Sequence, residues 1–223
     1  MENYTAHYTL IDLEKYSHRE AYERYLRLHC FYSITVQIDI TKLIDYLNKN
    51  NMRVYPAQIW LLSKAANNFT EFRMGRDINN RLICWEKISP LYTSLDANSQ
   101  NFSHIWTGYE AVYKCFYDDC VQDIKQFTNG KNFPQLTLGG FRHIPKNILN
   151  ISSIPWLDFS GLNINISEEC FSPIFTIGMH TKRENKTFMP LAIQLHHAVC
   201  DGYHVGKFVK YLNELIRNCD KLL

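Results

Sequence analysis

Residues 191–204 read LAIQLHHAVCDGYH, an apolar run that ends in two consecutive histidines and is followed by an Asp-Gly pair. The run predicts a β-strand over Leu191–His197 and a turn into a closing helix. Side chains of a strand alternate between its two faces, so His197 shares a face with Leu195 while His196 shares the opposite face with Gln194. The two histidines are therefore expected to have different surroundings.

The position of His197 suits a general base. A histidine at the end of an apolar strand is partly desolvated, which favours a neutral imidazole that can accept a proton. Asp201 follows on the turn, where a carboxylate can cap the helix or hold nearby groups in place. A lone strand histidine is more often a packed core residue, and Asp-Gly alone is an ordinary turn. The combined His-His-x-x-x-Asp-Gly-x-His pattern indicates catalysis.

A metal site is the alternative reading of this stretch, since His196, His197, Asp201 and His204 are all potential zinc ligands. Neighbouring strand residues point to opposite faces, so the paired histidines are poorly placed to chelate one ion. The helical H-E-x-x-H pattern of zinc proteases and the G-x-S-x-G turn of serine hydrolases are both missing from the sequence. No metal is predicted.

The rest of the chain predicts further strands and helices. Ser33–Ile40 alternates as a half-buried strand does, and Thr41 is a plausible N-cap for the helix after it. Pro56 fits the first turn of another helix. The remaining predictions are strands within 81–94, 162–166 and 173–181, and helices over 118–127 and 203–219. Because regular β-α-β alternation is absent, we expect one α+β domain over residues 1–223, a two-layer sandwich of helices on a mixed, mostly antiparallel sheet.

Composition excludes several classes of protein. Lys plus Arg is 24 against 22 for Asp plus Glu, which gives no electrostatic footprint for nucleic acid or an anionic membrane. The N-terminus lacks the basic flank and apolar run of a signal peptide, and no stretch is long enough to span a bilayer. The seven cysteines include no C-x-x-C pair, which suits free thiols. A cytoplasmic protein acting on small molecules is expected.

Several segments in order resemble the chloramphenicol acetyltransferase family, and the resemblance extends over nearly the whole chain. Besides the histidine segment, the matching pieces are Tyr8-Thr9, Tyr55-Pro56, Glu71–Met74, Phe102-Ser103 with Trp106, Asn150–Ser152 with Pro155-Trp156, Asn163–Asn165 and Pro173–Thr176. The resemblance implies the fold of CoA-dependent acyltransferases. It also implies a homotrimer with active sites at subunit boundaries, and no nucleic-acid or membrane partner.

The resemblance assigns a reaction and its catalytic residues. Acetyl passes from acetyl-CoA to the 3-hydroxyl of chloramphenicol in a ternary complex, and no metal takes part. His197 is the general base, with its tautomer held by its own backbone carbonyl. Ser152 donates a hydrogen bond to the oxyanion, and Thr176 positions a water there. Asp201 and Asn163 belong to a buried polar network.

Binding residues follow from the same resemblance. The drug pocket is assigned to Tyr25, Phe102, Phe133, Leu162, Ile164 and Ile174, and the acetyl-CoA channel to Tyr55, Trp156 and Arg53. Three departures stand out: His18 replaces the usual arginine partner of the aspartate, extra residues occur around 136–141, and His180 stands where a tyrosine often contacts the cofactor. We expect Asp201 to be buried and paired with His18 or Arg19, and the longer, always charged Arg19 is favoured.

Two other functions stay open on sequence alone. One is another acyltransferase with the H-x-x-x-D-G element, such as a dihydrolipoyl acyltransferase core or a plant-type enzyme, although their usual extensions are missing here. The other is a non-catalytic ligand-binding or metal-binding protein. Metal analysis and thiol release from acetyl-CoA with chloramphenicol separate these from the leading prediction.

Overall fold

The computed structural model describes residues 6–96, 100–128, 145–166 and 170–223. Its helices are α1 Arg19–Arg27, α2 Thr41–Lys49, α3 Val54–Asn67, α4 Tyr113–Phe127, α5 Gly202–Arg217 and α6 Cys219–Leu222, with a 3₁₀ turn η1 at Thr70–Phe72. Its strands are β1 Tyr8–Leu10, β2 Phe31–Asp39, β3 Met74–Arg76, β4 Leu82–Trp85, β5 Ser89–Leu95, β6 Phe102–Trp106, β7 Ile148–Ile154, β8 Ile174–Gly178, β9 Thr181–Arg183 and β10 Lys186–His196.

The strands form one large and one small sheet. The large sheet has the order β2-β10-β8-β7-β5-β6, with β9 paired to β10, and the small sheet has the order β1-β4-β3. Only the β5–β7 and β7–β8 pairs are parallel among the described strands. The predicted mixed, mostly antiparallel sheet is confirmed. Because β5, β7 and β8 run in the same direction, their carboxyl ends meet at one edge of the sheet.

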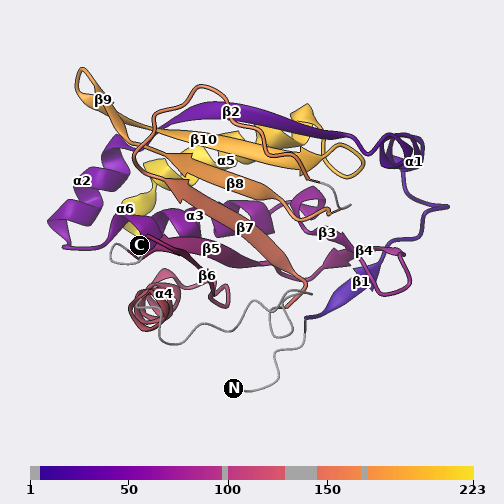
Figure 1. The fold of residues 1–223 in the computed structure, drawn as a ribbon, viewed down its shortest axis with the longest axis horizontal. Coiled ribbons are helices and arrows are strands. Elements are labelled where there is room, and N and C mark those ends of the chain that lie inside the picture. The colour runs from indigo at the N-terminus through magenta and orange to yellow at the C-terminus, as the bar shows by residue number, and fades with distance from the viewer. Residues whose placement is uncertain (1–5, 97–99, 129–144, 167–169) are drawn as a thin grey trace.

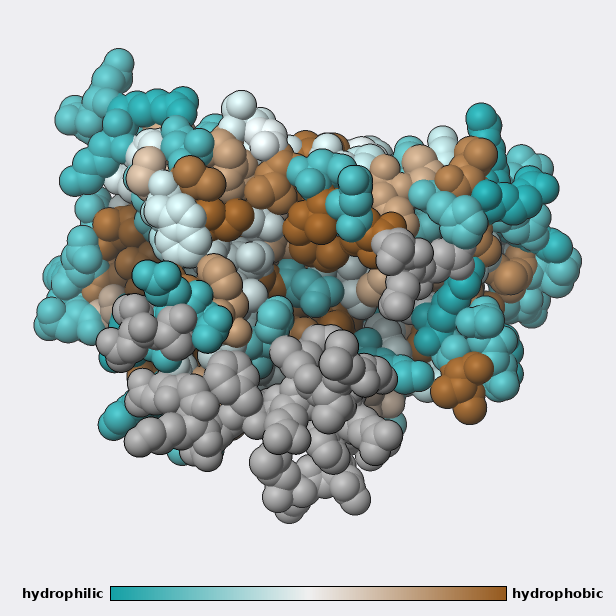
Figure 2. Space-filling view, in the orientation of Figure 1, coloured by the Kyte–Doolittle hydropathy of each residue, from teal (hydrophilic) through white to brown (hydrophobic). Residues whose placement is uncertain are grey.

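Helices α3 and α5 cover one face of the large sheet and lie behind it in Figure 1. The fully buried rings of Phe175 on β8 and Phe208 on α5 pack between the layers, with centroids 5.1 Å apart. Burying such aromatic rings is a large part of the hydrophobic stabilisation. This packing confirms the predicted two-layer sandwich. The opposite face carries no helix in Figure 1, and hydrophobic side chains lie exposed along its middle in Figure 2.

Two element predictions need correction. Residues 162–166 do not form a strand; they run as a loop that Gln194 holds against β10. The Gln194 side chain accepts a hydrogen bond from the Ile164 amide and donates one to the Ile164 carbonyl, both at 2.8 Å. The Gln194 side chain thus makes the two hydrogen bonds with Ile164 that the backbone of a neighbouring strand would make in a sheet. Thr41 is the first residue of α2 instead of its N-cap, and its amide donates to Asp39 Oδ1 at 3.1 Å.

Two helix boundaries also differ from the predictions. The helix predicted over 118–127 begins earlier, at Tyr113. The closing helix is divided at Asn218 into α5 and α6.

Candidate active site

His197 lies just beyond the end of β10, in the turn that leads to α5. Its amide donates to the Cys30 carbonyl at 2.8 Å, which anchors the turn. Its ring stacks flat on Tyr25, with centroids 3.9 Å apart and planes 5° apart, and lies 5.0 Å from the ring of Tyr32. Nδ1 is buried without a hydrogen-bond partner in the described structure, so the expected bond to its own carbonyl is absent. Aromatic packing is what positions this imidazole.

His196 points the other way and is buried at 1% exposure. It lies edge-on to Phe31 and Phe171, with ring centroids 4.6 and 5.0 Å away. Its Nδ1 accepts a hydrogen bond from the Ala198 amide at 3.1 Å. The different surroundings of the two histidines confirm the strand-parity prediction, and His196 has a structural role in the turn.

Asp201 is the N-cap of α5. Its carboxylate accepts hydrogen bonds from the amides of Tyr203 at 2.9 Å and His204 at 3.2 Å. The side chain is 43% exposed, and its side-chain neighbour is His204, whose Nδ1 lies 2.9 Å from Oδ1 and accepts a hydrogen bond from the Asp201 amide at 3.2 Å. The other ring nitrogen of His204 lies 3.3 Å from Glu71 Oε1. The imidazole therefore sits between two carboxylates.

The predicted burial and pairing of Asp201 are wrong in this chain. Arg19 forms ion pairs with Glu14 at 2.7 Å and Glu23 at 2.8 Å, because it emerges on the exposed side of α1. The ring of His18 lies edge-on to the ring of His204, with centroids 6.1 Å apart, so His18 contacts the histidine beside the aspartate instead of the aspartate itself. Asn163 is exposed, and no hydrogen bond joins it to Asp201 within the described ranges.

Ser152 and Thr176 lie side by side on β7 and β8. Thr176 faces Ala192 on β10, so the pair is level with a residue five positions before His197. At about 3.3 Å per residue, this separates them from the base by roughly 16 Å along the strand. By strand parity they also occupy the helix-free face, opposite the one that His197 continues. One chain alone does not bring the predicted base and oxyanion donor together.

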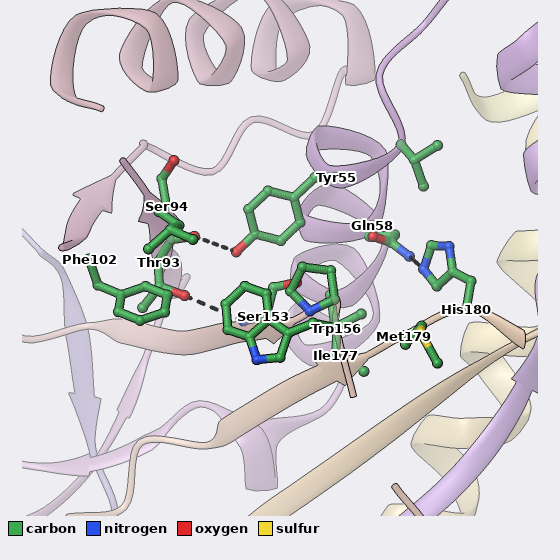
Figure 3. Close-up of a pocket in the computed structure, with 14 residues that line it drawn as sticks. Tyr55, Gln58, Thr93, Ser94, Phe102, Ser153, Trp156, Ile177, Met179 and His180 are labelled. Carbon is green, nitrogen blue, oxygen red and sulfur yellow. Dashed lines mark hydrogen bonds between the residues drawn. The ribbon is translucent and has the colours of Figure 1, made fainter. Parts of the chain in front are cut away.

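A cavity of about 520 Å³ opens at the carboxyl ends of β5, β7 and β8 (Figure 3), a size suited to a small-molecule site. Tyr55 and Trp156, both predicted for the acetyl-CoA channel, line it together with Phe102, which was predicted for the drug pocket. The Tyr55 hydroxyl donates to the Thr93 carbonyl at 2.9 Å, and burial raises the tyrosine's pKa. The rings of Phe102 and Trp156 are 6.2 Å apart.

At the polar end of the cavity, the contact between Gln58 and His180 was not predicted. Gln58 on α3 places its Nε2 at 2.7 Å from Nε2 of His180, and both residues line the cavity. Burial lowers the pKa of His180, which favours its neutral form. The two residues are far apart in sequence; the available signals were a glutamine inside an apolar helix and the position of His180, where a tyrosine often contacts the cofactor in the family that the sequence resembles.

Gly178 forms part of the cavity wall and leaves no room for a side chain. A Cβ there would lie 2.6 Å from Pro190 Cγ, 2.7 Å from Phe159 Cε1 and 3.0 Å from the Leu157 carbonyl oxygen. At this point of the wall, β8 therefore approaches Pro190 on β10 and the turn after β7 more closely than a side chain would allow.

The other predicted binding residues are dispersed. Arg53 is the N-cap residue of α3 next to the cavity residue Val54, and it is exposed. Ile174 faces Gln194 across the β8–β10 pair, and Leu162 precedes the segment that Gln194 holds. Phe133 and the extra residues at 136–141 lie outside the described residues. Over the ranges that are described, no three His, Cys, Asp or Glu side chains are grouped to hold a metal ion.

Comparison with known proteins gives the family. The family model described as "Chloramphenicol acetyltransferase" matches residues 6–215. A chloramphenicol acetyltransferase from Bacillus pumilus is 44% identical over 214 residues, which is 94% of this chain and 94% of that protein. One from Clostridium butyricum is 38% identical over 211 residues, 93% of this chain and 94% of that protein.

Solved structures show the fold. A chloramphenicol acetyltransferase superposes with a TM-score of 0.82 at 19% identity, covering 94% of this chain and 100% of that chain. A dihydrolipoamide acetyltransferase from Azotobacter vinelandii gives 0.64 at 12% identity, with 91% and 88% coverage. The family model and the identity to the Bacillus pumilus protein show that this chain belongs to the chloramphenicol acetyltransferase family.

Proposed function

We propose that the chain transfers acetyl from acetyl-CoA to the 3-hydroxyl of chloramphenicol and so inactivates the antibiotic. The observation that carries this proposal is the family membership, with 44% identity to a chloramphenicol acetyltransferase over nearly the whole chain. The position of His197 supports it. The imidazole lies in the turn between β10 and α5 and is held by stacking on Tyr25, so it can accept the proton of an incoming hydroxyl.

The reaction is a direct transfer. His197 removes the proton of the 3-hydroxyl while its oxygen attacks the thioester carbonyl, and Ser152 donates a hydrogen bond to the resulting oxyanion. Collapse of the tetrahedral intermediate breaks the carbon–sulfur bond. The imidazolium returns the proton to the leaving CoA thiolate, so no acyl-enzyme forms.

The active site is assigned to the boundary between two copies of the chain in a homotrimer. Ser152 and Thr176 are roughly 16 Å along the sheet from His197 and on the other face, so a second copy has to supply one of the two groups. Exposed apolar side chains suit such a boundary, among them Trp156 at 50% and Ile164 at 41% exposure.

Acetyl-CoA is assigned to the cavity at the carboxyl ends of β5, β7 and β8. Tyr55 and Trp156 offer aromatic walls to its apolar arm, and exposed Arg53 at the start of α3 offers a cation to a phosphate. Tyr25, Phe102, Phe133, Leu162, Ile164 and Ile174 remain the residues assigned to the drug.

The cytoplasm is the proposed location. All seven cysteines are free, as is usual in a reducing compartment. None of the helices in the described ranges has the length and apolar character needed to cross a bilayer.

The activity is tested by thiol release from acetyl-CoA in the presence and absence of chloramphenicol. We expect release only with the drug, and a product acetylated at the 3-hydroxyl. Dihydrolipoamide serves as the control acceptor, since a fold-level relative is a dihydrolipoamide acetyltransferase. Release that is independent of chloramphenicol, or greater with dihydrolipoamide, contradicts the proposal.

The shared site is tested by complementation. His197→Ala and Ser152→Ala are each expected to be nearly inactive alone. When the two are co-expressed, a site that takes His197 from one copy and Ser152 from another is intact, and random assembly restores about a quarter of the sites. No recovery in mixed assemblies would place both groups in one chain.

A further inference from the structure

The polar end of the cavity contains a buried amide with two hydrogen-bonding neighbours. Gln58 is only 4% exposed, and its Nε2 lies 2.7 Å from His180 Nε2 and 3.0 Å from Met189 Sδ. Figure 3 shows Gln58 and His180 facing each other at the end of the cavity away from Phe102. A buried amide group is costly unless its N–H groups are satisfied, so both neighbours have to act as acceptors.

The sulfur of Met189 fixes the orientation of this amide. A thioether is a weak acceptor and never a donor, so it can take an amide N–H but repels a carbonyl oxygen. With one N–H directed at Met189, the second N–H of Gln58 points at His180 Nε2. That nitrogen must therefore be unprotonated, and the hydrogen of the neutral imidazole is on Nδ1.

We propose that Gln58 is a positioning residue for acyl-donor binding, because it holds His180 in the tautomer whose single N–H donor is Nδ1. This inference rests on the assignment of the cavity to acetyl-CoA. A neutral imidazole with one fixed N–H on the cavity wall suits an uncharged carbonyl, and amide carbonyls occur along the pantetheine arm of acetyl-CoA. Gln58 acts through His180 without contacting the acyl donor itself.

The tautomer is measured by imidazole nitrogen NMR of the full-length protein with labelled histidine. We expect a protonated Nδ1 and an unprotonated Nε2 for His180 in the wild type. Gln58→Glu places a carboxylate at the same distance, which accepts from Nε2 and reverses the tautomer. A wild-type spectrum with the hydrogen on Nε2 overturns the proposal, because the amide would then be oriented the other way.

The consequence for binding is tested by replacing His180 with amide side chains, each of which places a nitrogen near one of the two ring nitrogens. His180→Asn places an amide nitrogen near the Nδ1 position, whereas His180→Gln places one near the Nε2 position. We expect His180→Gln to raise the KM for acetyl-CoA about 3–10-fold, as loss of one neutral hydrogen bond does, and His180→Asn to raise it less. The kcat and the KM for chloramphenicol should stay unchanged in both. Equal KM values in the two variants overturn the proposal.

Variants of Gln58 complete the test. Gln58→Met keeps the shape and removes both donors, so it should raise the KM for acetyl-CoA as His180→Gln does. Gln122→Met on the exposed side of α4 is the matched control and should change no kinetic constant. If Gln58→Met fails to fold, the His180 pair decides the matter.

Trp156→Ala separates this proposal from the assignment of the cavity. A raised KM for acetyl-CoA in Trp156→Ala, without the difference between His180→Asn and His180→Gln, overturns the role of Gln58 alone. An unchanged KM in Trp156→Ala overturns the assignment of the cavity and this inference with it.

Discussion

Among single residues, Ser152 gives the sharpest test, because the proposed mechanism uses its hydroxyl mainly in the transition state. Ser152→Ala should lower kcat about 10²–10³-fold with little change in either KM. Steady-state kinetics with both substrates measure this. Ser63→Ala is the control, because it removes only a bond to the Ile59 carbonyl within α3, and it should keep the wild-type kcat. A near-normal kcat in Ser152→Ala would contradict the catalytic role and would mean that the serine only packs within β7.

The adjacent histidines should give opposite results when each is replaced. His197→Ala should lose about 10²–10⁴-fold in kcat while the protein stays folded, as removal of a general base does. His196→Ala should lower the melting temperature more, because it empties a buried site between Phe31 and Phe171 and leaves the Ala198 amide without its acceptor. Equal loss of activity in two folded variants contradicts these roles.

Strand parity was enough to separate His196 from His197, because alternation is a local property. The partner of Asp201 was missed for another reason. His204 stands at the third helical position and folds back onto the cap, a capping-box arrangement that short-range spacing could have indicated. The contact between Gln58 and His180 joins residues 122 positions apart and depends on the tertiary fold.

Among the elements, α5 depends on the cap that Asp201 provides. Asp201→Ala should lower the free energy of unfolding by about 0.5–2 kcal/mol, whereas Asp201→Asn should retain most of the stability because asparagine caps equally well. Chemical denaturation measures both. If Asp201→Asn is as unstable as Asp201→Ala, the charge beside His204 matters more than the hydrogen bonds to the helix amides.

The contact between α4 and the segment after β6 contains a half-buried carboxyl with a pH-dependent effect on stability. Thr107 Oγ1 donates to Asp123 Oδ2 at 2.6 Å, and burial raises the pKa of Asp123. Because the pKa of Asp123 is higher in the folded than in the unfolded protein, its protonated form stabilises the fold. This contribution is complete below the unfolded-state pKa of about 3.9 and is lost as the pH rises through the folded-state pKa.

Asp123→Asn keeps an acceptor for Thr107 and removes the half-buried charge. It should therefore raise the melting temperature near neutral pH, and the gain should shrink as the pH falls towards about 4. Thermal unfolding of both proteins across this range tests the effect. A gain that is independent of pH would have another cause.

Element order and layer arrangement could be predicted because hydrophobic periodicity and turn residues are local signals. The prediction of a strand over 162–166 was wrong, because this segment is a loop. Leu162, Ile164 and Ile166 alternate as in a strand, yet the pairing partner of Ile164 is the side chain of Gln194 instead of a backbone. Periodicity did not reveal that Gln194 satisfies the backbone here, nor that Ile164 is 41% exposed.

At the scale of the whole molecule, the separation of Ser152 from His197 predicts an assembly. Sedimentation should give three times the 26.3 kDa of one chain, and activity should fall on dilution below the concentration at which copies stay associated. Wild-type activity from a 26.3 kDa species would contradict a site shared between copies.

Gly178 restricts how this scaffold can be altered by laboratory evolution. Because Pro190, Phe159 and the Leu157 carbonyl fill the space where a Cβ would stand, any replacement forces β10 or the segment after β7 to shift. A wider cavity for longer acyl thioesters is reached more easily by shortening Trp156 or Met179, whose side chains are exposed. Mutant libraries that keep codon 178 fixed will therefore contain more folded members for the same number of clones.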